Sequence, residues 1–266
     1  MIIAIDIGNT NISFGVFEKT SDQPVYNANI QTDKNMTTDE LAIKYMNLRN
    51  LWTTGKNSPF NNREIDEEVI ISSVVPRLDY EFRHMFEKYY NKTPHFVTIS
   101  DASLKINYNN PSEVGADRIV NALGGVMLYQ GFNLIIIDFG TATTFDIVEK
   151  SGIYEGGLII PGVMTSLSAM EEKASKLPHI DLSIPSRLIG KYTVESIRSG
   201  LINGNGAMVD NLVERVINDM NWTNADTKVI ATGGLSKIIK PASLRIDVLE
   251  LNLTLRGLYY VWKSQK

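Results

Sequence analysis

Short apolar runs alternate along the chain with stretches of helical spacing, and the runs end at acids or turn residues. The first run, Ile2–Ile5, contains no polar residue, which is typical of a strand buried on both faces. Asp6 ends this run, and residues 11–18 predict a second strand. Gly8 then falls in a tight connection, where its freedom to adopt positive φ is useful. The alternation of strands and helices predicts an α/β fold.

A capping-box pattern marks the first predicted helix. Thr37 is followed by Glu40, and the helix is expected to run from there to about Arg49. The further elements expected in this part of the chain are a loop at 55–62, a strand at 68–75 ended by Pro76, a helix at 78–90 and a strand at 95–99. The Asn-Asn-Pro turn in 107–111 predicts the end of a first domain, over residues 1–112.

The pattern of the N-terminus returns in the second half of the chain. After a predicted helix from Val114 to about Tyr129, the segment Leu134–Val148 repeats the order of Ile2–Val16: strand, Asp, one residue, Gly, small polar turn, strand. The spacing between these features is the same in both segments. We therefore expect two domains of similar architecture, 1–112 and 113–266, derived from a duplication.

Glycines recur in two later segments. Gly233 and Gly234 form a turn between an apolar strand and a helix. Gly200, Gly204 and Gly206 lie inside a helical pattern that runs to Val216, where each costs about 1 kcal/mol relative to alanine. Close packing against another element of the chain, or against a second subunit, is expected to offset that cost. The apolar positions Met164, Leu167 and Met170 are predicted to be core.

The two Asp-x-Gly hairpins have a chemical use. Glycine lets backbone N–H groups approach an anion, and side-chain oxygens supply ligands to a hard metal ion. Either hairpin alone is more simply explained as an ordinary turn. Two of them at corresponding positions, together with the Gly233–Gly234 turn against which a nucleoside can lie, favour a polyphosphate site.

Composition excludes several functions. The net charge is -4, from 26 basic and 30 acidic residues that are interspersed, so nucleic acid is not an expected partner. The chain has no cysteine, which excludes disulfides, thiolate metal sites and a cysteine nucleophile. No apolar run approaches the roughly 20 residues that span a bilayer, and no signal peptide is evident. No membrane contact is expected, and the cytoplasm is the expected compartment.

Five motifs together resemble one family nearly end to end. They are Asp6-Ile-Gly-Asn-Thr10, Ser72-Ser-Val-Val-Pro76, Gly115-Ala-Asp-Arg118, Asp138-Phe-Gly-Thr-Ala142 and Gly157-Leu-Ile-Ile-Pro-Gly162. This set is similar to the type III pantothenate kinases of the actin-like, sugar-kinase and heat-shock-ATPase superfamily. The resemblance implies two duplicated ribonuclease H-like domains, each a mixed sheet with flanking helices, and a cleft between them.

The resemblance assigns the substrate side of the site. Asp117 aligns with the family's catalytic base, which accepts the proton of the pantothenate hydroxyl. From the sequence alone, a helix cap or an ion pair with Arg118 is an equally good reading of this residue. Thr193 is also a good N-cap residue, and the two roles can coexist. The positions that match the family's substrate contacts are Tyr108, Gly115, Ala116, Asp117, Arg118 and Thr193.

The resemblance also assigns the nucleotide side. The positions that match its first phosphate loop are Asp6, Gly8, Asn9, Thr10, Asn11 and Ser13, with Asp6 near Mg²⁺. Thr141 would touch ATP, and Gly233 and Gly234 match the adenosine loop. Asp138 resembles the site of a monovalent cation, K⁺ or NH₄⁺. Ile119 and the pair Ile197-Arg198 depart from the usual family residues, which leaves details of substrate contact open.

The activity implied is ATP-dependent phosphorylation of the primary hydroxyl of pantothenate to 4'-phosphopantothenate, the first step of coenzyme A biosynthesis. The family also implies a homodimer. Two alternatives remain: another small-molecule kinase of the superfamily, such as a sugar kinase, and a nucleotide-sensing transcriptional accessory protein on the same scaffold. Tyr108 and the Gly115–Arg118 motif speak against the first, and the three acids Asp6, Asp117 and Asp138 speak against the second.

Overall fold

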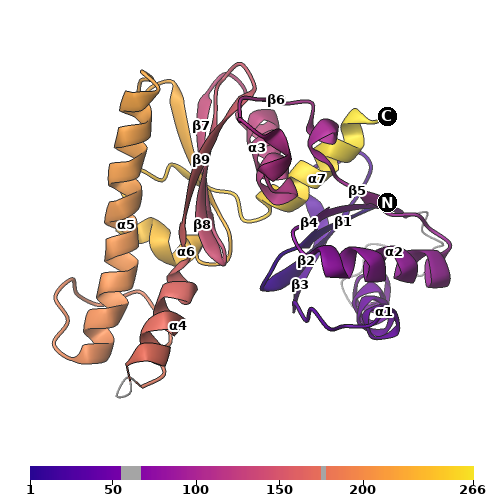
Figure 1. Ribbon diagram of the computed structural model, residues 1–266, viewed down its shortest axis with the longest axis horizontal. Coiled ribbons are helices and arrows are strands. Elements are labelled where there is room, and N and C mark those ends of the chain that lie inside the picture. The colour runs from indigo at the N-terminus through magenta and orange to yellow at the C-terminus, as the bar shows by residue number, and fades with distance from the viewer. Residues whose placement is uncertain (55–66, 175–177) are drawn as a thin grey trace. The chain divides into compact units, whose positions relative to one another are not determined.

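The computed structural model describes residues 1–54, 67–174 and 178–266, and the loop predicted at 55–62 lies outside them. The chain forms two compact units (Figure 1). The first consists of Met1–Ser103, Asn110–Gly124 and Thr254–Lys266, and the second of Leu104–Asn109 and Gly125–Leu253. Both are therefore discontinuous in sequence. The division into domains 1–112 and 113–266, which follows the repeated pattern and not spatial contacts, stays a prediction.

The first unit contains a five-stranded mixed sheet of order β3-β2-β1-β4-β5. Its strands are β1 (Ile2–Ile7), β2 (Asn11–Phe17), β3 (Pro24–Gln31), β4 (Glu68–Ser73) and β5 (His95–Phe96). Strands β1 to β3 are antiparallel, whereas β4 runs parallel to β1 and β5 parallel to β4. The central β1 is buried at every position except Asp6, which is half-buried, as its uninterrupted apolar run predicts.

Helices cover both faces of this sheet. On one face, Ile3, Ile5 and Ile7 form a core with buried residues of α1 (Thr38–Thr54) and α2 (Pro76–Tyr90). On the other face, Gly15 lies against Leu255 of α7 (Leu253–Ser264), and α7 packs in turn against Val120 of α3 (Ala116–Leu128). The start of α3, beside residue 115, is thus fixed to the face that carries the side chain of Asp6.

Most predicted element boundaries are correct within a few residues. Thr37 and Glu40 do form the expected reciprocal hydrogen bonds at the start of α1. The helix continues five residues beyond Arg49, because the fully buried Trp52 extends its core-facing side. The strand expected at 95–99 is wrong in length: β5 has two residues, and Ile99–Ala102 is a 3₁₀ helix that begins with a Thr98–Asp101 capping box.

The second unit contains a six-stranded mixed sheet of order β11-β10-β7-β8-β9-β6. Its strands are β6 (Lys105–Ile106), β7 (Asn133–Phe139), β8 (Ala142–Val148), β9 (Ile153–Pro161), β10 (Thr227–Thr232) and β11 (Val248–Leu249). The 27-residue helix α5 (Thr193–Asp219) runs along this sheet (Figure 1). Its Val209 and Val213 pack with Ile135 and Ile137 in the core. Helices α4 (Val163–Lys173) and α6 (Ser236–Ile239) complete the unit.

The same strand arrangement occurs in both units. β1 lies between antiparallel β2 and parallel β4, and β7 lies between antiparallel β8 and parallel β10. The two hairpins differ by one residue at the turn, since Asp6 pairs with Ser13 whereas Asp138 pairs with Thr144. The equal spacing seen in the sequence therefore aligns β1 with β7, but it misaligns the paired strands by one position.

The α5 glycines divide into two kinds. A Cβ on Gly206 would lie 2.1 Å from the carbonyl oxygen of Ala242, so this glycine allows the close packing that was predicted. Gly200 and Gly204 are exposed, and a Cβ on either would have no described atom within 4 Å. Packing among the described residues therefore explains why glycine occurs at position 206, but it does not explain Gly200 or Gly204.

The prediction for α4 is wrong in part. Leu167 is buried, but Met164 and Met170 are 44% and 40% exposed. The reason is that only one stripe of this short helix faces the sheet, while the methionines lie outside that stripe.

Among the helices of residues 1–54, 67–174 and 178–266, none combines the length and the apolar character that crossing a bilayer requires.

Candidate active site

The loop between β1 and β2 is held by hydrogen bonds within the loop and from Thr32. The Gly8 N–H donates to the Asn11 carbonyl at 3.0 Å, and a Cβ on Gly8 would lie 3.0 Å from the same oxygen. Thr32 fastens the loop twice: its hydroxyl donates to the Gly8 carbonyl at 2.7 Å, and its N–H donates to the Thr10 carbonyl at 2.9 Å. Gly8 is not among the glycines with positive φ, so close approach, not a left-handed conformation, accounts for it.

Each central aspartate lies between two hydroxyl residues. Across the sheets, the paired rows are Ser13–Asp6–Ser72 in the first unit and Thr144–Asp138–Thr232 in the second. Paired residues of neighbouring strands project from the same face, so carboxylate and hydroxyls are adjacent. Ser72 is fully buried, and its hydroxyl has no hydrogen-bond partner among the described residues. No pattern in the sequence gives Ser72, Thr144 or Thr232 a role, because only strand register brings them to the aspartates.

Asp117 lies at the second residue of α3, and its Oδ1 accepts the Arg118 N–H at 2.8 Å. Burial is the largest influence on this carboxyl and raises its pKa above the ordinary value, which the Arg118 N–H and guanidinium partly oppose. Arg118 is itself only 8% exposed, so its guanidinium acts on Asp117 from a buried position and not from the surface. The N–H contact shows that a local role at the helix start coexists with any chemical role.

Gly115 leaves room for the Asp117 carboxylate. A Cβ at residue 115 would lie 2.5 Å from Asp117 Oδ1 and 3.7 Å from Val74 Cγ1. Val74 in turn donates its N–H to the Ile7 carbonyl at 3.0 Å, at the end of β1. Within the first unit, the structure therefore brings Asp6 and Asp117 to the same end of the sheet, the carboxyl end of β1 and β4. In open α/β sheets, ligands bind at this end of the strands.

The second unit gathers Asp138, the Gly140–Thr141 turn and Gly233. Gly233 has φ +85°, and a Cβ there would lie 2.3 Å from Asp138 Oδ1 and 2.7 Å from the Phe139 nitrogen. Glycine is therefore required both by conformation and by space. The hydroxyl of Ser236 donates to the Gly233 carbonyl at 2.7 Å, which fixes the turn.

The Gly140–Thr141 turn is held from the other side by the start of α4. The Gly162 N–H donates to the Thr141 carbonyl at 3.1 Å, and the Thr165 hydroxyl donates to the same oxygen at 2.6 Å. A Cβ on Gly162 would lie 2.3 Å from that carbonyl. The motif Gly157–Gly162 thus serves to position Thr141, a role that its sequence alone did not indicate.

These oxygen-rich turns suit hard cations held by few protein ligands. No group of three or more His, Cys, Asp or Glu that could hold a metal occurs within the described part of the chain. A single carboxylate with neighbouring hydroxyls fits Mg²⁺, which keeps several of its waters. Asp6, with Ser13 and Ser72 in register, is such a set, and Asp138 with the adjoining backbone carbonyls offers oxygen ligands to a second cation.

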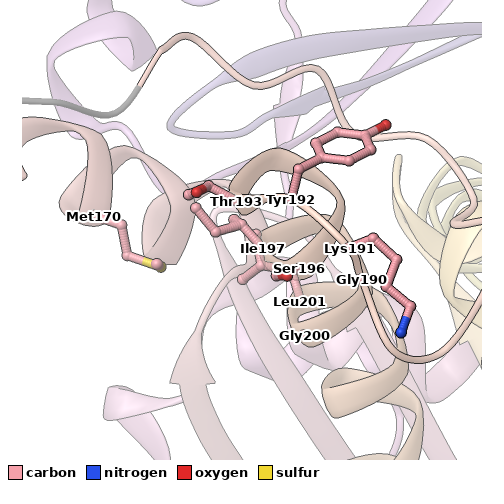
Figure 2. Close-up of a pocket in the computed structure, with 9 residues that line it drawn as sticks. All are labelled: Met170, Gly190, Lys191, Tyr192, Thr193, Ser196, Ile197, Gly200 and Leu201. Carbon is pink, nitrogen blue, oxygen red and sulfur yellow. The ribbon is translucent and has the colours of Figure 1, made fainter.

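Thr193 opens onto a pocket of about 580 Å³ at the start of α5 (Figure 2). The lining residues are Met170, Gly190, Lys191, Tyr192, Thr193, Ser196, Ile197, Gly200 and Leu201. The N-cap prediction for Thr193 is wrong: Tyr192 is the N-cap residue, and no side chain caps the helix. Glu195 instead accepts the N–H of Lys191, just before the helix, at 2.8 Å. The Thr193 hydroxyl does not cap α5, so it can serve a ligand.

Tyr108 lies elsewhere in the second unit and is not among the residues that line this pocket. Its ring packs over Gly156, which has φ +113°, with Cε2 3.4 Å from the position of a Cβ there. The adjacent Asn107 donates its N–H to the Tyr154 carbonyl at 2.8 Å. Tyr108 is 38% exposed, so it is anchored along one side of its ring and accessible on the other.

Two mixed sheets, each with an aspartate at the end of its central strand, define the fold of the actin-like and sugar-kinase ATPases. Solved structures share it. The activator of the 2-hydroxyisocaproyl-CoA dehydratase from Clostridium difficile has a TM-score of 0.53 at 13% identity, over 99% of this chain and 96% of that one. A Campylobacter jejuni protein described as a Baf family transcriptional activator has a TM-score of 0.58 at 17% identity, over 99% and 98%. At these identities the likeness shows the fold alone.

Sequence comparison is more specific. The sequence model of the type III pantothenate kinase family matches residues 2–215. The type III pantothenate kinase of Desulfosudis oleivorans is 43% identical over 266 residues, with 99% of each chain covered. That of Halalkalibacterium halodurans is 39% identical, also with 99% of each chain covered. The chain belongs to the type III pantothenate kinase family.

Proposed function

We propose that this protein transfers the γ-phosphoryl group of ATP to the primary hydroxyl of pantothenate. The product is 4'-phosphopantothenate, and the reaction is the first step of coenzyme A biosynthesis. Family membership over nearly the whole chain supports the activity. The structural observation that carries it is Asp117: a carboxyl of raised pKa, given room by Gly115, at the end of the sheet where Asp6 lies.

Asp117 is proposed to accept the proton of the attacking hydroxyl. Phosphoryl transfer through a loose transition state requires mainly positioning and late removal of that proton. A carboxyl whose pKa is raised by burial is a stronger base once ionised than an exposed one. The Arg118 N–H holds Oδ1 and thereby orients the carboxylate.

Asp6, Gly8, Asn9, Thr10, Asn11 and Ser13 are proposed to form the first phosphate site, Thr141 a second contact with ATP, and Gly233 and Gly234 the adenosine site. Asp6 would hold Mg²⁺, which neutralises phosphate charge when bound. Asp138 would hold K⁺ or NH₄⁺, since its carboxylate lies beside backbone oxygens that such an ion can use. The bracing of both turns supports these roles, because it prepositions donors before the nucleotide arrives.

Pantothenate is proposed to contact Tyr108, Gly115, Ala116, Arg118 and Thr193. A buried guanidinium such as that of Arg118 suits carboxylate and hydroxyl oxygens. Thr193 does not cap α5, and it lines the pocket. We further propose that the protein is cytoplasmic and a homodimer. The homodimer is supported by the exposed Gly200 and Gly204, at which a Cβ would meet no described atom within 4 Å, and Gly200 lines that pocket.

A coupled assay of ADP release tests the activity. Purified protein with ATP, Mg²⁺ and K⁺ should release ADP when pantothenate is added and not when a panel of sugars is added. Asp117→Asn should bind ATP with unchanged affinity and lose most turnover. Release of ADP with a sugar but not with pantothenate would identify a sugar-type kinase, and ATP binding without ADP release would leave a nucleotide sensor.

A further inference from the structure

The proposed first phosphate loop contains no positive charge of its own. Residues 6–13 include neither lysine nor arginine, whereas the triphosphate they are proposed to bind carries several negative charges. Asp6 adds another. A site of this kind gains affinity when a cation is placed at the phosphates. The structure supplies a candidate from a distant part of the sequence.

Lys34 is that candidate. Its Nζ donates to the Oδ1 of Asn9, in the loop, at 2.9 Å. The segment that carries Lys34 is fastened to the same loop through Thr32, by the two hydrogen bonds to the Gly8 and Thr10 carbonyls. The Asn35 N–H is in turn bound by Asp33 Oδ1 at 2.9 Å, which tightens the turn around Lys34. The backbone that carries Lys34 is therefore fixed beside the loop, so the position of the ammonium group does not depend on its hydrogen bond to Asn9 alone.

Among the described residues, no carboxylate neutralises the charge of Lys34. Two other exposed lysines of this unit form ion pairs, Lys19 with Glu68 at 2.7 Å and Lys88 with Asp39 at 2.8 Å. Within the described residues, Lys34 contacts the neutral amide of Asn9 and forms no ion pair. Its exposed ammonium therefore keeps its full charge for a ligand of the loop.

We propose that Lys34 is a nucleotide-binding residue, whose ammonium contacts the β- or γ-phosphate of ATP from the open side of the first loop. The proposal rests on the assignment of residues 6–13 as a phosphate site. Lysine suits this task because it acts as a compact point charge with three donors and can keep Asn9 as a partner while it binds phosphate oxygens. Nothing in the five motifs that identify the family points to residue 34.

Calorimetric titration separates a charge role from a bracing role. ATP, ADP and AMP are titrated, with Mg²⁺, into the wild type, Lys34→Gln and Lys34→Arg. Glutamine can still donate to Asn9 but has no charge, whereas arginine keeps the charge. Lys44→Gln, an exposed lysine of α1, is the matched control. For Lys34→Gln, ATP should bind about tenfold more weakly and AMP within twofold of the wild type. Lys34→Arg and Lys44→Gln should bind ATP almost normally.

Two results would overturn the proposal while leaving the phosphate site intact. One is ATP affinity of Lys34→Gln within twofold of the wild type. The other is an equal loss for ATP and AMP, which would make Lys34 a structural brace. If the wild type binds ATP no better than AMP, the phosphate assignment of residues 6–13 fails and the role of Lys34 fails with it. The KM for ATP should follow the same order as the affinities, with kcat changed less than KM.

Discussion

At the scale of single residues, Gly115 shows how the absence of a side chain makes room for a neighbouring carboxylate. Gly115→Ala would place a methyl group 2.5 Å from Asp117 Oδ1, so the carboxylate must turn away. Because the obstructing atom is the end of a side chain and not backbone, the fold should lose less than about 1 kcal/mol. Misplacement of the base should lower kcat about 10- to 100-fold. Steady-state kinetics and thermal unfolding check this together.

A matched control is Gly131→Ala, at a position with no described atom within 4 Å of a Cβ but with φ +84°. That variant should lose stability through backbone strain and keep its kcat. If Gly115→Ala instead unfolds the protein while any folded fraction turns over normally, then Gly115 has a packing role and not the proposed one.

The raised pKa of Asp117 predicts a cost to stability. In the folded state the ionised carboxyl is disfavoured by burial, so the folded pKa lies above the unfolded one. The penalty is therefore present at pH values above the folded pKa and disappears as the pH falls below the ordinary value of 3.8. Asp117→Asn should raise Tm at neutral pH, and the difference from the wild type should vanish in acid.

Thermal unfolding of both proteins between neutral pH and pH 3 is the measurement. Asp39→Asn is a useful contrast, because Lys88 and Tyr89 hold the pKa of that exposed carboxyl below its usual value. Loss of the Asp39 carboxylate should lower Tm slightly at neutral pH, whereas Asp117→Asn should raise it. An Asp117→Asn variant that is less stable than the wild type at pH 7 would show that the carboxylate stabilises the fold.

At the scale of elements, the glycines of α5 form a pair for comparison. Gly206→Ala puts a methyl group 2.1 Å from the Ala242 backbone oxygen, so the helix or the 3₁₀ turn at Lys240–Ala242 must shift. This should destabilise the protein by about 1–3 kcal/mol. Gly204→Ala meets no described atom and should stabilise the helix by up to about 1 kcal/mol through propensity alone. Urea unfolding of the two variants gives the signs directly, and equal effects would contradict the distinction.

Local signals predicted the elements whose causes are local. The Thr37–Glu40 capping box, the apolar run of β1 and the glycine turn at Gly233 all depend on neighbours in sequence, and the structure contains each. β3 was not predicted. As an edge strand with alternating burial, it has the weak pattern of a segment that depends on β2 for its partner.

The candidate site was predictable only in part, for the same reason. Family motifs pointed to Asp6, Asp117 and Asp138 by sequence, and structure adds that Asp6 and Asp117 share one end of a sheet. The hydroxyls of Ser72 and Thr232 lie beside the aspartates through strand pairing, and Lys34 reaches Asn9 across a loop. Such contacts join positions distant in sequence, so no periodicity or spacing reveals them.

At the scale of the whole molecule, the exposed glycines of α5 bear on assembly. Exposed glycines inside a long helix lower its stability without a gain in packing, unless another surface approaches them closely. Gly200 and Gly204 lie one turn apart, and Gly200 borders the pocket that contains Thr193. In a homodimer, the partner would approach this face, and the pocket would be completed beside the interface.

Gly204→Leu tests this arrangement, because a Cβ at residue 204 meets no described atom of its own chain within 4 Å, whereas a close dimer would exclude the larger side chain. Sedimentation velocity should show a dimer for the wild type and a shift towards monomer for the variant, by at least tenfold in dissociation constant. Asn218→Leu, about four turns further along the same helix, adds an equally large apolar group away from the pocket and should remain dimeric. If Gly204→Leu dimerises as the wild type does, the two molecules meet at another surface, and the KM for pantothenate should then be unaffected. A wild type that sediments as a monomer at assay concentrations, yet turns over pantothenate, would show that one chain holds the complete site.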